Sequence, residues 1–151
     1  MDNYRLLLMI LILLLVFVGI GIGCWFLVRA KRKKPDDIDL MEGHDFEYFC
    51  ADLLRRRGFQ EVEVTKGSGD YGIDILAEKE GVTYAIQCKR YTAPVGVKAV
   101  QEAYAGRDYY DRMVGAVLTN QYFTQPAVEA AKKLKILLWD RGYLESMLEE
   151  M

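Results

Sequence analysis

Two short segments of this sequence carry residue types that can bind a metal ion and a phosphate. Asp74 ends the glycine-rich segment 69–74 (GDYGID), and after twelve intervening residues the chain reads Gln87-Cys88-Lys89. Residues i and i+2 of a strand point to the same face. Gln87 and Lys89 should therefore project together, while Cys88 points to the other face.

A turn between the two segments should bring them side by side. The segment 78–81 (EKEG) is typical of a hairpin turn between two apolar strands. Folding about this turn places Asp74 roughly opposite Ile86 and Gln87, one strand spacing away. A carboxylate, an amide and an ammonium group can then converge, and such a set can bind a metal ion and a phosphate.

The setting of Asp74 favours a functional site over a structural one. Asp74 interrupts the apolar run Ile73-x-Ile75-Leu76, and Gln87 and Lys89 interrupt a second apolar run in the same way. A carboxylate in such a strand needs a partner or a metal to offset its burial. A buried Asp–Lys ion pair is the structural alternative.

The glycine-rich loop itself matches GxGxxG over residues 67–72. A dinucleotide-binding site requires a helix after this motif, whereas a strand follows it here, which excludes that class of site. The glycines instead indicate a tight loop that lets a backbone or a phosphate approach closely. Asp70 in this loop is typical of a turn residue.

The elements that must position these residues follow from hydrophobic periodicity and from glycine and proline breaks. They predict an α-β-β-β-α-β-α-β-α order, which is an α/β fold with a mixed central sheet flanked by helices. The expected helices are 44–57, 97–110, one that begins at Pro126 and runs to about 135, and 143–151; the expected strands are 61–65, 73–78, 82–89, 113–119 and 136–139.

The first forty residues differ in character from the rest. No charged residue occurs from 6 to 28, a length that can cross a hydrocarbon core of about 30 Å as a helix. A cleaved signal peptide is the alternative, but the apolar run is longer than such signals and lacks an Ala-x-Ala-like site. We therefore expect a short external tail at 1–5, a transmembrane helix at 6–28, a basic flank and linker at 29–40, and one soluble domain at 41–151.

Charge sets the expected orientation and limits the possible partners. Five basic residues follow the apolar run and only Arg5 precedes it, so the positive-inside rule places the soluble domain in the cytoplasm, below the cell inner membrane. From Leu40 onward, 14 Lys and Arg face 18 Asp and Glu, a balance of −4. Nucleic-acid binding must then depend on local patches and a metal. Cys50 and Cys88 match no zinc spacing and are expected to be small core residues in a reducing compartment.

The combined motif resembles a known family. Gly-x-Gly-Asp-x-Gly-Ile-Asp followed by Gln-x-Lys-Arg-Tyr is similar to the Mrr-type branch of the PD-(D/E)xK nuclease superfamily. The likeness covers most of the soluble part and implies a restriction-endonuclease-like fold. Gln87 stands where most of the superfamily has an acid, and this exchange is typical of the Mrr-type branch.

The resemblance assigns a role to each motif residue. Asp74 would be the metal-binding carboxylate, Gln87 would take the second acidic position, and Lys89 would be the active-site lysine. Glu47, on the first soluble helix, matches the acid that completes the site. Gln101, on the next helix, matches a polar position of the branch.

The chemistry of these groups is coherent as a phosphodiester hydrolase. Mg²⁺ or Mn²⁺ bound by Asp74, Gln87 and the Cys88 carbonyl would lower the pKa of a bound water and neutralise a phosphate. Lys89 would orient that water or stabilise the developing charge. Since Gln87 removes one negative charge, we expect weak binding of a single metal ion.

These expectations define a membrane-anchored, metal-dependent endodeoxyribonuclease that hydrolyses DNA, with restriction of foreign DNA as one role. The residues expected to contact DNA are Ser68, Arg90 and Gln101. A homodimer is compatible with so small a domain. The alternative is a non-catalytic adaptor at the membrane that keeps the fold for binding nucleic acid or protein.

Overall fold

The computed structural model describes residues 9–20, 38–65 and 71–149, and the chain divides into two units, 1–34 and 35–151. In the first unit, residues 9–20 form a helix inside the predicted span 6–28. Residues 6–8 and 21–28 of that span lie outside the described residues. Among the residues that the structure describes, no helix is both long and apolar enough to cross a membrane.

The second unit has the predicted element order. Its helices and strands are α3 (Gly43–Arg56), β1 (Gln60–Val64), β2 (Ile75–Lys79), β3 (Val82–Lys89), α4 (Val97–Tyr109), β4 (Val114–Thr119), α5 (Gln125–Leu134), β5 (Ile136–Trp139) and α6 (Arg141–Glu149). The strands form one sheet in the order β1-β2-β3-β4-β5. Strands β1 to β3 pair antiparallel, and β3, β4 and β5 pair parallel. The predicted mixed α/β sheet is confirmed.

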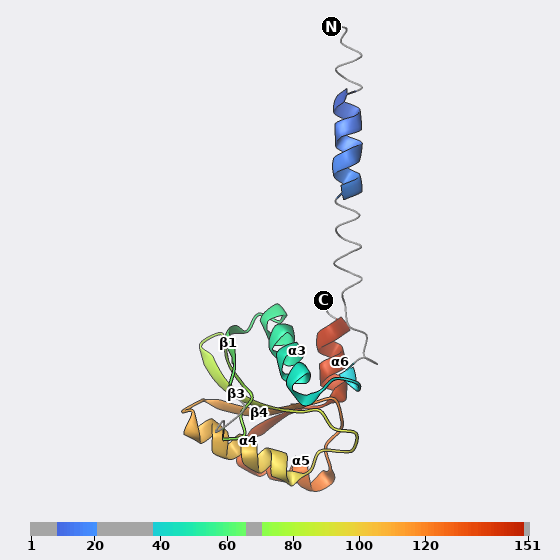
Figure 1. The fold of residues 1–151 in the computed structure, drawn as a ribbon. Helices are drawn as coiled ribbons and strands as arrows, with labels where there is room; N and C mark the ends of the chain where they lie inside the picture. Colours follow the sequence, from blue (N-terminus) through green and yellow to red (C-terminus); the bar gives the residue numbers. More distant parts are fainter. Residues whose placement is uncertain (1–8, 21–37, 66–70, 150–151) are drawn as a thin grey trace. The chain divides into compact units, whose positions relative to one another are not determined.

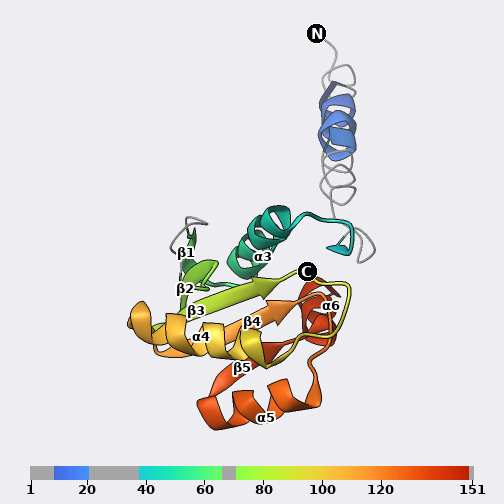
Figure 2. The ribbon, with the colours of Figure 1, turned by 60° about the horizontal axis from the view of Figure 1, so that its bottom comes forward.

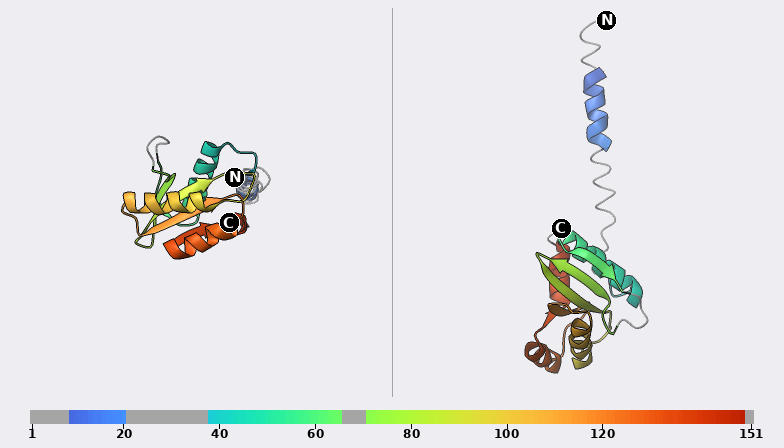
Figure 3. Two further views of the ribbon diagram at one scale, coloured as in Figure 1. Left: turned by 90° about the horizontal axis from the view of Figure 1, so that it is seen from below. Right: turned by 90° about the vertical axis from the view of Figure 1, so that its left-hand side faces the viewer.

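Helices cover both faces of the sheet, as Figures 1 and 2 show. Helices α3 and α6 pack on one face, where Phe46, Leu54 and Leu144 are buried in one core cluster. Helices α4 and α5 lie side by side on the other face (Figure 3), where Val100, Ala103 and Ala127 belong to a second cluster. A sheet that is buried on both faces explains the continuous apolar runs of β3 and β4.

The hairpin between β2 and β3 is tighter than the predicted four-residue turn. Lys79 pairs with Val82, so the loop consists of Glu80 and Gly81 alone. Both have positive φ, 53° and 77°, as a two-residue type I′ turn requires. The turn fixes the register in which Ile75 pairs with Ile86.

Strand β2 begins two residues later than predicted, at Ile75 in place of Ile73. The cause is the side chain of Asp74, whose Oδ2 accepts the Cys88 N–H at 2.6 Å. A carboxylate oxygen thus takes the Cys88 donor that a main-chain carbonyl would accept in a regular antiparallel ladder.

The apolar residues Val97, Val100 and Tyr104 of α4 do not share one buried stripe, because only Val100 is buried. Its buried residues are Ala99, Val100, Ala103 and Gly106. Tyr104 is exposed, and the Arg107 guanidinium lies 4.8 Å from the centre of its ring. Gly106 is required at its position, since a Cβ there would lie 2.3 Å from Ile73 Cγ1. Small residues therefore let α4 approach the sheet closely.

Candidate active site

Asp74 bridges the start of β2 to its neighbours through main chain and side chain. Its N–H donates to the Ile86 carbonyl at 3.0 Å, and its carbonyl accepts the Thr65 N–H at 2.9 Å. Its Oδ2 accepts the Cys88 N–H, a charge-assisted bond that fixes the carboxylate against β3. The predicted placement of Asp74 beside Ile86 and the following residues is confirmed.

Gln87 and Lys89 project to the same face, as the strand period predicted, and both contact Glu102 of α4. Gln87 Nε2 donates to Glu102 Oε2 at 2.7 Å, and Lys89 Nζ lies 3.0 Å from the same oxygen. Lys98, one turn earlier on α4, pairs with Glu102 Oε1 at 3.7 Å. Sequence reasoning had not singled out Glu102.

The environment of Glu102 favours its ionised form. Burial is the largest influence and raises the pKa, but it is outweighed by the hydrogen bonds from Gln87 and Lys89 and the charges of Lys89 and Lys98. The pKa of Glu102 is therefore lowered below its usual value. An ionised carboxylate only accepts hydrogen bonds, so it must face the amide nitrogen of Gln87.

The other end of the Gln87 amide is the feature that fits a ligand. Gln87 is 2% exposed, and its Oε1 is buried without a hydrogen-bond partner among the described residues. A buried acceptor left unpaired costs about 1–3 kcal/mol, which a cation at this oxygen would offset. Asp74 Oδ2 is occupied by the Cys88 N–H, and a carboxylate has further lone pairs for a metal. The donor set of Asp74 and Gln87 therefore suits a hard cation such as Mg²⁺.

The described residues contain no group of three or more His, Cys, Asp and Glu side chains that could hold a metal. The predicted set is not a group of this kind, because it consists of one carboxylate, one amide oxygen and the Cys88 carbonyl. Metal binding by these three oxygens remains a prediction. The same holds for Mg²⁺ or Mn²⁺ as the bound ion.

Cys88 and Glu47 lie on the α3 side of the sheet. Cys50 and Cys88 are buried free thiols, as the sequence predicted. A hydrogen bond with Cys50, burial and the negative charges of Asp74 and Glu47 all raise the pKa of the Cys88 thiol. The carboxylate of Glu47 itself lies 3.1 Å from His44 Nδ1.

The structure describes two of the three residues that are expected to contact DNA, Gln101 and Arg90. Ser68 lies outside the described residues. Gln101 is exposed beside Glu102. Arg90 is half-buried; its Nη1 donates to the Asp39 carbonyl at 3.4 Å, and its Nε is buried without a partner in the described part of the chain. Their contact with DNA stays a prediction.

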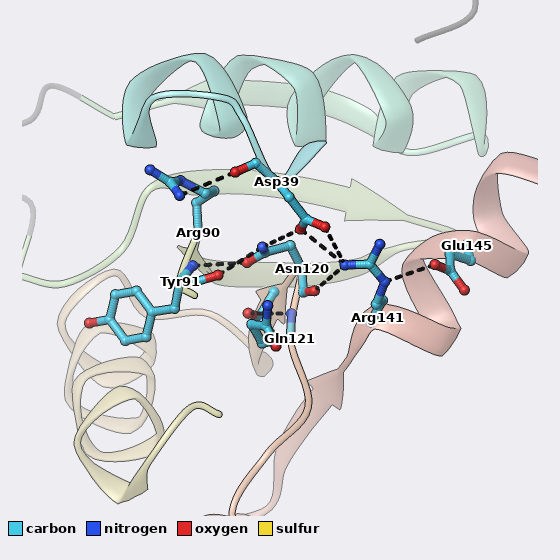
Figure 4. A network of polar contacts seen from close by, with 8 residues as sticks. Asp39, Arg90, Tyr91, Asn120, Gln121, Arg141 and Glu145 are labelled. Carbon is cyan, nitrogen blue, oxygen red and sulfur yellow. Dashed lines mark hydrogen bonds and ion pairs between the residues drawn. The ribbon is translucent and has the colours of Figure 1, made fainter. Parts of the chain in front are cut away.

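A polar network at the carboxyl ends of the parallel strands holds the segment before α3 in place (Figure 4). Asn120 is its buried centre: it accepts the Tyr91 N–H at 2.8 Å and donates to Asp39 Oδ1 at 2.7 Å. Arg141 Nη1 donates to both carboxylate oxygens of Asp39, at 3.0 and 2.8 Å. The network ties Asp39 to the segment that directly follows Lys89.

The sheet order, the two helical layers and the position of Asp74, Gln87 and Lys89 define a restriction-endonuclease-like α/β domain. Residues 38–148 match the model of the restriction endonuclease family Mrr_cat, which is most of the chain. The chain belongs to this family, and the predicted resemblance is confirmed. A search of curated proteins found no match.

Solved structures with TM-scores above 0.5 show the same fold. A protein of unknown function, AF1548, is 25% identical, with a TM-score of 0.62; the match covers 72% of this chain and 66% of that one. The DNA modification-dependent restriction endonuclease AspBHI is 19% identical, with a TM-score of 0.54, and covers 70% of this chain and 30% of its own. The MspJI restriction endonuclease, solved in complex with a 27-mer oligonucleotide, is 19% identical, with a TM-score of 0.49, covering 69% and 27%. The chain thus spans about a third or less of these two endonucleases.

Proposed function

We propose that this protein is a metal-dependent endodeoxyribonuclease that hydrolyses DNA phosphodiester bonds. The observation that carries the proposal is the buried Oε1 of Gln87, which has no hydrogen-bond partner in the part of the chain that the structure describes. Lys89 follows two residues later on the same face of β3, and the Cys88 N–H holds the Asp74 carboxylate against this strand. Membership of the restriction endonuclease family supports the same activity.

Asp74, Gln87 and the Cys88 carbonyl would hold the cation, with Glu47 contributing from α3. A bound Mg²⁺ or Mn²⁺ would supply an activated water and neutralise phosphate charge. Lys89 would stabilise the negative charge that develops on the non-bridging oxygens as water adds to phosphorus and the P–O ester bond breaks. The Lys89 side chain is 20% exposed, so a phosphate can reach it from solvent.

Cleavage of supercoiled plasmid by the purified full-length chain tests this proposal. Wild type should nick DNA with Mg²⁺ or Mn²⁺. Asp74→Ala should lose at least about a hundredfold in rate, because loss of a residue that only supports a metal ligand already costs about 10–100-fold. Asp108→Asn, an exposed carboxylate on α4, is the control and should keep full activity. A folded wild-type protein that binds DNA without cutting it would replace the nuclease by the adaptor function.

We further propose that the apolar segment 6–28 anchors the protein in the cell inner membrane, with the nuclease domain in the cytoplasm. The helix 9–20 carries exposed apolar side chains from Met9 to Ile20, and contiguous apolar surface of this kind is typical of a membrane or protein contact. The full-length protein should stay in the membrane pellet after alkaline carbonate; release into the supernatant would remove the anchor from the proposal. Light scattering in detergent will decide between a monomer and a homodimer.

A further inference from the structure

Glu102 contacts Gln87 and Lys89 of the candidate active site but is not part of the sequence motif that predicted this site. Its Oε2 is the common acceptor for Gln87 Nε2 at 2.7 Å and Lys89 Nζ at 3.0 Å. Its side chain is 29% exposed, so it lies at the edge of the buried face of α4. Both partners of Oε2 are residues of β3 that point toward α4, whereas the other oxygen, Oε1, pairs with Lys98 of α4 itself.

The amide of Gln87 has two ends with opposite chemistry. Nε2 only donates and Oε1 only accepts. A rotation of the amide by about 180° exchanges the two ends at little cost in shape, so the amide alone does not select the end that faces a cation. An acid at this position would not have this problem, because both of its oxygens accept.

Glu102 removes this ambiguity. If the amide were rotated, Gln87 Oε1 would face the Glu102 carboxylate, and two acceptors would meet at hydrogen-bond distance. The observed orientation instead satisfies Nε2 and directs Oε1, buried and without a partner among the described residues, away from Glu102.

Gly72 keeps this arrangement compact. A Cβ on Gly72 would lie 3.0 Å from Glu102 Cβ and 3.5 Å from Gln87 Nε2. The chain therefore passes directly over the Gln87–Glu102 pair, which leaves little space for rotamers that would move the amide away from Glu102.

We infer that Glu102 is a positioning residue for metal binding: it orients the Gln87 amide so that Oε1 serves as a ligand where other sites would use an acid. The inference rests on the proposed metal-dependent function. In this role Glu102 acts through Gln87 and does not act on the cation by its own charge.

The affinity for Mn²⁺, measured on the full-length protein by titration calorimetry without DNA, tests the inference. Glu102→Gln should weaken Mn²⁺ binding about tenfold, the low end for loss of a group that orients a ligand, because the new amide can still accept a hydrogen bond. Asp108→Asn makes the same chemical change on an exposed carboxylate of α4 and should leave the affinity within about twofold.

The decisive comparison repeats Glu102→Gln in the Gln87→Glu background. A carboxylate at position 87 needs no orientation, and the new amide at position 102 can donate to it. Glu102→Gln should then leave Mn²⁺ affinity unchanged or raise it, the opposite of its effect beside Gln87. A direct charge effect of Glu102 predicts weaker binding in both backgrounds, and that result would overturn the inference.

The failure of the two proposals can be told apart. If wild type binds Mn²⁺ and Glu102→Gln binds it equally well, the positioning role is wrong and the metal site stands. If folded wild type binds no Mn²⁺ at millimolar concentration, the metal site is wrong and the role of Glu102 falls with it.

Discussion

Gly72 offers a sharp test of how tightly the site is packed. It has φ of +78°, and a Cβ at this position would lie 3.0 Å from Glu102 Cβ. Gly81, in the β2–β3 turn, has nearly the same φ of +77° but would place its Cβ in open space, with nothing within 4 Å. Alanine at these two glycines therefore separates backbone strain from steric pressure on the site.

The expected magnitudes follow from these contacts. The left-handed conformation costs an alanine about 1–2 kcal/mol at either position. Pressure on Glu102 and Gln87 adds about 1–3 kcal/mol at Gly72 alone, the range for overpacking. Gly72→Ala should thus lower the free energy of unfolding by at least about 1 kcal/mol more than Gly81→Ala.

Urea unfolding of both variants at pH 7 measures this difference, with the denaturation midpoint compared at constant slope. Mn²⁺ affinity, measured on the same samples, should fall for Gly72→Ala and stay at the wild-type value for Gly81→Ala. Equal destabilisation by the two substitutions, with Mn²⁺ affinity intact in both, would refute the close packing of Gly72 on the Gln87–Glu102 pair.

Two further outcomes are expected. Burial raises the pKa of Asp39, but hydrogen bonds from Asn120 and Arg141 and the charges of Arg141 and Arg90 lower the pKa overall. The ionised carboxylate of Asp39 therefore stabilises the fold fully above about pH 4, and this stabilisation is lost as the pH falls through the lowered pKa. Because this side chain is 40% exposed, Asp39→Asn should cost only about 0.5–1 kcal/mol at pH 7, and the gap in melting temperature between it and wild type should shrink at pH 3. The pKa of the Cys88 thiol is raised by Cys50, by burial and by nearby carboxylates, so Cys88 should not react with a thiol reagent at pH 7 until the protein is unfolded. Labelling in a Cys24→Ser background measures this. Fast labelling of the folded protein would contradict the burial of Cys88.

The sequence was sufficient for the element order and for the main contacts of β3. Alternation placed Gln87 and Lys89 on one face, and the composition of the turn placed Asp74 beside Ile86, because strand period and turn chemistry are local properties. The start of β2 was wrong by two residues, since the bond from Cys88 N–H to the Asp74 carboxylate is a tertiary contact.

Glu102 was missed for a similar reason. The spacing of Val97, Val100 and Tyr104 indicates one helical face, but of these three only Val100 belongs to the buried stripe, which otherwise consists of small residues. Glu102 lies three residues after Ala99 and four before Gly106, at the margin of that stripe. The sequence shows only that Glu102 is an acid beside a stripe of small residues. Its partners on β3 could be identified only from the packing of α4 on β3.

Metal-dependent DNA cleavage by Lys89→Ala is the sharpest test of the proposed active site. Lys132, exposed on α5, supplies the matched control with the same chemical change away from the site. With Mg²⁺ or Mn²⁺, full-length wild type and Lys132→Ala should nick plasmid DNA at equal rates, while Lys89→Ala should be slower by about a hundredfold or more, as for loss of a group that stabilises the transition state. Equal cleavage by Lys89→Ala and wild type would contradict an active site built on Asp74, Gln87 and Lys89.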